Sequence, residues 1–202
     1  MIKHLLIIFI LSIFISKNAN ASFLLEPYAG FALSGSIEDT DTNPLKGTYS
    51  GLEFGARAGI SMMGFFGGAT YNMATETDYK MTESDQIRDN SRASRTDLGL
   101  FVGYEFPVMV RVWGSYYLNT KLEGKSNSGN NPKLDATETW NGNGIGLGVG
   151  FTPMPFLSFN IEYKSFTYED EDDTSASPVN SLLAPNVTAN VILVSVSLPI
   201  NL

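Results

Sequence analysis

The side chains of this chain that could do chemistry are carboxylates, amines and guanidinium groups, because the sequence has no cysteine and a single histidine, His4. A serine nucleophile normally needs a neighbouring base, most often histidine, to take its proton. His4 lies in an amino-terminal segment that is typical of a cleaved signal peptide. The composition therefore excludes histidine-dependent lipase, acyltransferase and protease chemistry. We expect no enzyme activity, no cofactor and no metal.

Charged residues recur at alternate positions of several short segments. They are Glu26, Glu53, Arg57, Asp97, Glu105, Arg111, Glu162 and Lys164. Two neighbouring carboxylates could act as general acid and general base. Alternatively the charged groups pair with one another in a polar interior, because buried charges must be compensated. A third possibility is an ionic plug whose members exchange partners and so open a narrow water path.

The segments that carry these charges alternate strictly between apolar and other residues, and this period of two indicates β-strands. In residues 51–61, for example, Leu52, Phe54 and Ile60 share one face, while Glu53 and Arg57 lie on the other. Eight such segments occur, at 24–34, 51–61, 65–72, 96–106, 108–119, 139–151, 156–168 and 190–202. The connections between them alternate between long and short, and the long polar ones are 35–50, 74–95, 120–138 and 169–188.

These features predict an all-β fold, an eight-stranded antiparallel up-and-down transmembrane β-barrel, because membrane barrels have long loops at one end and short turns at the other. The apolar faces carry no charge, whereas an Arg or Lys that faces lipid at mid-depth costs roughly 2–4 kcal/mol. A soluble barrel of lipocalin type would instead line a ligand cavity with its apolar face. Aromatic residues near the ends of the apolar faces favour the membrane barrel: Phe65, Phe106, Phe151, Tyr71, Tyr116 and Tyr163. Since side chains nearly fill an eight-stranded interior, we favour the paired polar interior over a catalytic pair.

Residues 1–21 are typical of a secretory signal peptide, with Lys3, an apolar run and a small-x-small pattern at Ala19-Asn20-Ala21. An uncleaved anchor is the alternative, but the apolar run is shorter than the roughly 20 residues of a spanning helix. Residues 22–202 are then the barrel. Loss of Lys3 and Lys17 leaves 11 of the 13 basic residues against 21 acidic ones, a formal charge of −10. This balance argues against nucleic acid as a partner.

Two further features allow more than one interpretation. The alternate glycines between Gly142 and Gly150 could leave a lane for a solute, or could make room for bulky side chains such as Trp113, Tyr117, Phe101 and Arg111. We favour the second. The acidic run 169–173 could bind divalent cations between lipopolysaccharide molecules, but like-charge runs are usually solvated loops.

In this pattern, the chain resembles the small eight-stranded outer-membrane barrels of Gram-negative bacteria, of the OmpA transmembrane-domain and opacity-protein kind. The resemblance covers Phe23 to Leu202. The final strand, with Pro199 on its polar face, looks like the carboxy-terminal signal that the family's assembly machinery recognises. The apolar residues of this signal would be Ile192, Val194, Val196, Leu198, Ile200 and Leu202.

The resemblance implies a monomer in the outer membrane, in contact with lipid and lipopolysaccharide and inserted by the outer-membrane assembly machinery. It implies a non-enzymatic role in envelope structure and in surface interaction through long extracellular loops. The alternative that it leaves open is a narrow porin-like channel for small solutes through the polar lumen.

Overall fold

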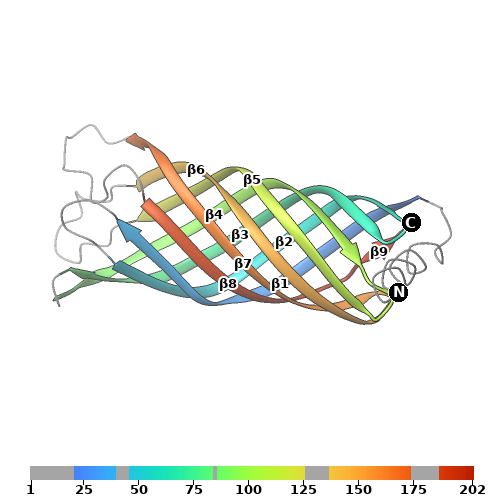
Figure 1. The fold of residues 1–202 in the computed structure, drawn as a ribbon. Coiled ribbons are helices and arrows are strands. Elements are labelled where there is room, and N and C mark those ends of the chain that lie inside the picture. The colour runs from blue at the N-terminus through green and yellow to red at the C-terminus, as the bar shows by residue number, and fades with distance from the viewer. Residues whose placement is uncertain (1–20, 40–45, 84–85, 126–136, 174–186) are drawn as a thin grey trace, which may run out of the picture.

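The computed structural model describes residues 21–39, 46–83, 86–125, 137–173 and 187–202, which form an elongated barrel of tilted strands (Figure 1). The predicted signal peptide lies outside the described residues, apart from its last residue, Ala21. No helix in the described ranges is long and apolar enough to span a membrane. The strands are β1 (Ser22–Asp39), β2 (Lys46–Met62), β3 (Phe65–Glu83), β4 (Gln86–Glu105), β5 (Val110–Lys125), β6 (Thr137–Met154), β7 (Leu157–Asp173), β8 (Val187–Ser197) and β9 (Ile200–Asn201).

Each strand pairs antiparallel with the next along the chain, and the sheet closes where β8 and β9 pair with β1. Val196 lies opposite Ala29 and Val194 opposite Phe31. The last strand thus pairs with the first, as closure of the predicted barrel requires. Because β8 and β9 are two parts of one closing strand, the fold is the predicted eight-stranded antiparallel up-and-down barrel. Closure removes the exposed edges that an open sheet would leave.

Pro199 causes the break between β8 and β9. It lies on the lumen face and is buried, and it has no N–H to donate to the ladder. Pairing with β1 continues on both sides of it: the Leu198 N–H donates to the Pro27 carbonyl at 2.9 Å, and Leu202 and Phe23 exchange hydrogen bonds of 2.9 and 3.0 Å. The proline therefore removes one rung of the ladder and leaves the barrel closed.

The strands extend further at the long-connection end than the alternation predicts, and the predicted loop bounds were wrong. β3 and β4 pair as far as Glu83 opposite Gln86, inside the segment 74–95 that we expected to be a loop. β7 likewise runs to Asp173 and includes the acidic run. Backbone hydrogen bonding in an antiparallel ladder needs no apolar face, so strands continue in polar sequence where the alternation of apolar residues has stopped. Figure 1 shows the β3–β4 hairpin projecting from the end opposite the carboxy terminus.

The two faces of the barrel wall are inverted relative to a soluble protein. Large apolar side chains on the outer face are exposed, among them Leu100, Val102, Leu147 and Ile161. Charged side chains on the inner face are buried. An exposed apolar surface that surrounds a barrel is a lipid-facing surface. The alternation therefore assigned the faces correctly.

The short connections are tight turns. Met63 and Gly64 have φ of 54° and 87° and join Met62 to Phe65, as in the two-residue type I′ hairpin, which needs positive φ at both central positions. Near these turns, Tyr104 packs edge-on against Phe65 at 4.8 Å and against Phe106 at 5.0 Å between ring centroids. Aromatic residues thus gather on the outer face at the short-turn end, as an interfacial girdle does.

Candidate functional site

The lumen holds a first chain of alternating charges near the short-turn end. Arg111 donates two hydrogen bonds to Glu26, from Nη1 to Oε1 at 3.1 Å and from Nη2 to Oε2 at 2.8 Å. Arg57 bridges from Glu26, at 3.3 Å, to Glu162, at 2.9 Å. The Ser197 hydroxyl also donates to Glu26 at 2.7 Å, so the closing strand joins this chain.

A second chain of alternating charges lies closer to the long-loop end. Glu53 pairs with Lys164 and, at 2.8 Å, with Arg95. The Nε atom of Arg95 lies 3.0 Å from Asp97, whose carboxylate also accepts a hydrogen bond from Thr120 at 2.6 Å. This chain therefore connects β7, β2, β4 and β5 across the lumen.

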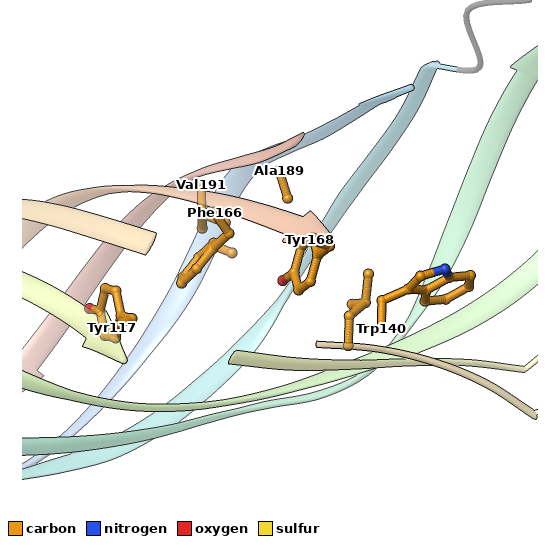
Figure 2. Close-up of a cluster of buried hydrophobic side chains, with 8 residues drawn as sticks. Tyr117, Trp140, Phe166, Tyr168, Ala189 and Val191 are labelled. Atoms are coloured by element: carbon orange, nitrogen blue, oxygen red, sulfur yellow. The ribbon is translucent and has the colours of Figure 1, made fainter. Parts of the chain in front are cut away.

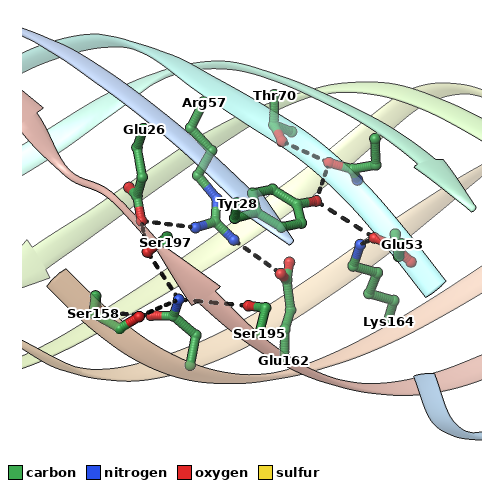
Figure 3. A network of polar contacts seen from close by, with 12 residues as sticks. Glu26, Tyr28, Glu53, Arg57, Thr70, Ser158, Glu162, Lys164, Ser195 and Ser197 are labelled. Carbon is green, nitrogen blue, oxygen red and sulfur yellow. Dashed lines mark hydrogen bonds and ion pairs between the residues drawn. The ribbon is translucent and has the colours of Figure 1, made fainter. Parts of the chain in front are cut away.

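Two tyrosines join the two chains, and Figure 3 shows one of them, Tyr28, between Arg57 and Glu53. The Tyr28 hydroxyl contacts Asn72 and donates to Glu53 at 3.4 Å, while the Arg57 guanidinium lies 5.0 Å from the Tyr28 ring centroid. The Tyr117 hydroxyl donates to Glu162 at 3.0 Å, and Lys164 Nζ lies 5.5 Å from the Tyr117 ring. The lumen is thus one connected polar network.

The buried charges balance. Among the described side chains, the charged residues in the buried class are four acidic and four basic: Glu26, Glu53, Asp97, Glu162, Arg57, Arg95, Arg111 and Lys164. Each chain has two groups of each sign and is neutral. Burial of a charge is costly unless a partner compensates it, and removal of one partner typically costs about 3–5 kcal/mol. The balance therefore compensates the buried charges of both chains.

Aromatic rings hold the guanidinium groups from the side. The Arg57 guanidinium lies 4.4 Å from the Trp113 ring centroid, Arg111 lies 4.4 Å from Phe66, and Arg95 lies 4.4 Å from Phe166. Cations at this distance from a ring face are attracted by its quadrupole. The rings also fill space, so charge and packing close the lumen together.

The alternate glycines of β6 make room for this filling. A Cβ atom added at Gly148 would lie 2.1 Å from Cε2 of Trp113, and one added at Gly150 would lie 2.8 Å from Cγ of Arg111. A Cβ at Gly144 would lie 2.5 Å from Phe166. The interpretation that the glycines accommodate bulky side chains is confirmed at these positions, and the lane is occupied by side chains.

An apolar cluster closes the lumen beyond the second chain, toward the long loops (Figure 2). Its buried members are Ala32, Tyr117, Leu122, Trp140, Phe166, Tyr168, Ala189 and Val191. Beside Glu53 and Arg95, a cavity of about 20 Å³ remains. That volume holds roughly one water molecule.

The structure brings seven of the eight charged residues singled out in the sequence into this buried network. The eighth, Glu105, is half-buried at the end of β4, opposite Arg111 in the ladder. Each carboxylate of the network touches at least one cation, and among the described residues no group of three metal-ligating side chains comes together. The arrangement among the described residues supports ion pairing.

Sequence reasoning missed one charged member of the network, Arg95, and its hydroxyl and amide members, among them Tyr28 and Tyr117. Arg95 lay in a segment expected to be a loop, although it shares the parity of Asp97 and of the lumen face. The hydroxyls of Tyr28 and Tyr117 were on the correct face, but nothing in the spacing marks an aromatic residue as a network member. If the alternation is extended from Asp97 by two residues toward the amino terminus, Arg95 falls on the lumen face.

Comparison with known proteins agrees with this architecture. A search of curated protein sequences finds no relative. Among solved structures, Neisserial surface protein A is 14% identical, with 89% of this chain and 98% of that chain covered and a TM-score of 0.56. Ail of Yersinia pestis is 12% identical, with 88% and 99% covered and a TM-score of 0.55. OprG of Pseudomonas aeruginosa is 12% identical, with 92% and 98% covered and a TM-score of 0.53.

At these identities the likeness to solved structures concerns the fold alone. The family is given by a model of the outer membrane protein beta-barrel domain, which matches residues 6–198 and so nearly the whole chain. The inverted faces and the closed ladder with an even number of strands are typical of such a domain in a bilayer. The chain belongs to the family of outer membrane protein beta-barrel domains.

Proposed function

We propose that this outer-membrane barrel is a non-enzymatic structural element of the envelope that presents interaction surfaces at its long-loop end. It stands in the membrane as a monomer, in contact with lipid and lipopolysaccharide, and reaches its place through the outer-membrane assembly machinery. In outer-membrane barrels the long loops face outward and the short turns face the periplasm. The network in the lumen then serves stability, and the extended hairpins serve contact.

The observation that carries this proposal is the filled lumen. Each of three arginines lies between a carboxylate and an aromatic ring: Arg57, Arg95 and Arg111. Neighbouring side chains fill the space beside the lumen-facing glycines of β6. The cavity at Glu53 and Arg95 has room for about one water. A barrel filled in this way has its useful surface outside the lumen.

The surface that favours contact is the β3–β4 hairpin, which stays paired, with two shifts of register, as far as Glu83 opposite Gln86. Paired strands present a preformed surface and lose less conformational entropy on binding than a flexible loop of the same length. Ail of Yersinia pestis was solved in complex with the heparin analogue sucrose octasulfate. Our chain has 21 acidic and 13 basic residues, so we expect a partner other than a polysulfated one.

A narrow channel is the second candidate. The observation that favours it is the position of Arg57 between two carboxylates, 3.3 Å from Glu26 and 2.9 Å from Glu162. If the Arg57 guanidinium moved toward one of these two carboxylates, it would still have an ion-pair partner. A rearrangement that opens a water path would therefore leave no buried charge unpaired.

Single-channel recording in a planar bilayer separates the two functions. The structural proposal expects no discrete conductance from the purified barrel. Reproducible steps that disappear in Arg57→Ala or Glu162→Ala would establish the channel and overturn the structural proposal. Folding of each variant is checked by the difference in gel migration between boiled and unboiled samples.

A second experiment tests the surface role. Residues 76–92 are replaced by a two-residue turn, and cells that carry the full or the shortened barrel are compared for adhesion to surfaces and for resistance to detergent. We expect adhesion to fall while detergent resistance stays, because the lumen network lies below the hairpin. Equal adhesion of the two strains would contradict a contact role for this hairpin.

A further inference from the structure

A groove crosses the lipid-facing wall of the barrel over β4, β5 and β6. It has a volume of about 500 Å³ and is lined by ten residues. Val102 and Leu147 form its sides, and Tyr104, Val112 and Val149 lie at the end nearest the short turns. Gly114 lies on its floor, between Val102 on β4 and Leu147 on β6 in the ladder. Both flanking side chains are 66% exposed.

The glycine at position 114 is not required by the protein itself. A Cβ atom added there would meet nothing closer than Cδ2 of Leu147 at 3.8 Å, an ordinary contact. Its φ is not in the left-handed region, where Gly64 lies. Glycine within a strand destabilises it relative to alanine. The contrast with Gly148, where a Cβ would collide with Trp113, indicates that the space at Gly114 serves something outside the wall.

We propose that this groove binds one acyl chain of a phospholipid in the periplasmic leaflet. The groove lies toward the short turns, which face the periplasm in outer-membrane barrels. Its walls are the apolar side chains of valine and leucine, with the ring of Tyr104 at the end where an aromatic girdle meets the headgroup region. Lipid chains and the groove walls are equally apolar, so the hydrophobic effect does not drive binding and van der Waals packing decides it. An acyl chain that fills the groove makes dispersion contacts that would be missing if the groove were empty.

A second copy of the chain is a poorer occupant. Stable protein interfaces use roughly 20–30 residues a side, and the groove is lined by ten. A single flexible acyl chain fits a channel between Val102 and Leu147, which are separated by one strand, whereas the broad wall of a second barrel does not enter it. The proposal rests on the membrane placement of the barrel and is independent of what its long-loop end contacts.

Native mass spectrometry of the detergent-solubilised barrel with palmitoyl-oleoyl phosphatidylethanolamine tests the site. We expect one lipid retained by the wild type, and occupancy at least about fivefold lower in Gly114→Leu, which corresponds to about ten lost carbon–carbon contacts. The matched control is Ala69→Leu, on the exposed face of β3 away from the groove, which should keep the lipid. Gel migration shows that each variant is folded.

Fluorescence gives an independent readout, because Trp113 lies in the wall beneath the groove, with its indole buried on the lumen side, and Trp140 lies at the other end of the lumen. In a Trp140→Phe background, phospholipid that carries bromine midway along one acyl chain, mixed as a minor component into plain vesicles, should quench Trp113. Gly114→Leu should weaken this quenching, and Ala69→Leu should not. Equal lipid occupancy or equal quenching in Gly114→Leu and wild type overturns the proposal. So does a dimer that Gly114→Leu disperses, since the occupant is then a second copy.

Discussion

Glu26 accepts two hydrogen bonds from Arg111, although the two residues lie 85 positions apart in the chain. The same carboxylate accepts a bond from Arg57 at 3.3 Å and from the Ser197 hydroxyl at 2.7 Å. Strands β1, β2, β5 and β8 therefore meet at one side chain. Because Arg57 and Arg111 are both buried, Glu26 compensates two cations that have little water to solvate them.

Glu26→Ala should lower the free energy of unfolding by about 3–5 kcal/mol, because it leaves two buried guanidinium groups with lost compensation. Urea unfolding of the barrel in lipid vesicles, followed by gel migration, measures the loss. The control is Glu123→Ala, which breaks the 2.7 Å pair with Lys121. Those side chains are 39% and 47% exposed, so we expect less than about 1 kcal/mol. Equal losses would contradict the structural importance of the buried chain.

Ile161→Arg should impair insertion, because Ile161 lies between Phe159 and Tyr163, midway along the exposed apolar face of β7, and an arginine at mid-depth costs roughly 2–4 kcal/mol. Phe156→Arg is the depth control, since it is also exposed but lies in the short turn before β7, where the cost falls to about 0–1 kcal/mol. The folded fraction in vesicles, read from gel migration, compares them. If both variants insert equally well, the assigned membrane depth is wrong.

Gly148→Ala should destabilise the barrel by about 1–3 kcal/mol, because the added methyl group collides with Trp113 and overpacks the lumen. Gly114→Ala places the same methyl group in open space on the outer face and should be neutral or stabilising by roughly 0.5–1 kcal/mol. Urea unfolding of both variants gives the comparison. A loss at position 114 as large as at position 148 would mean that the outer wall, like the lumen, is tightly packed there.

The alternation of the sequence was enough to predict the barrel because lipid imposes a strict chemical difference between the two faces of each strand. Glu53 between Leu52 and Phe54 can face only the lumen, and a slip by one residue would put it in lipid. The same constraint fixes which residues of β1 and β8 face the lumen. Strand count, order and closure could therefore be predicted without any contact information.

Outside the lipid layer that constraint disappears, and prediction failed there. Arg95 and the paired ends of β3 and β4 at Glu83 and Gln86 lie in polar sequence, so the alternation of apolar residues no longer marks the strand. The choice of partners within the lumen was also beyond the sequence. Whether Glu53 pairs with Arg95, Arg57 or Lys164 depends on the stagger of strands around the barrel, which alternation alone does not specify.

The carboxy-terminal residue tests whether the closing strand is also an address for assembly. Leu202 is 74% exposed and its backbone pairs with Phe23, so its side chain contributes little to the folded barrel. Leu202→Ser should therefore slow the appearance of folded barrel in pulse-labelled cells while leaving urea unfolding in vesicles nearly unchanged. Leu33→Ser, on β1 and 60% exposed, is the matched control and should assemble at the wild-type rate. Similar delays in the two variants would mean that outer-face hydrophobicity, rather than the last strand, sets the rate of assembly.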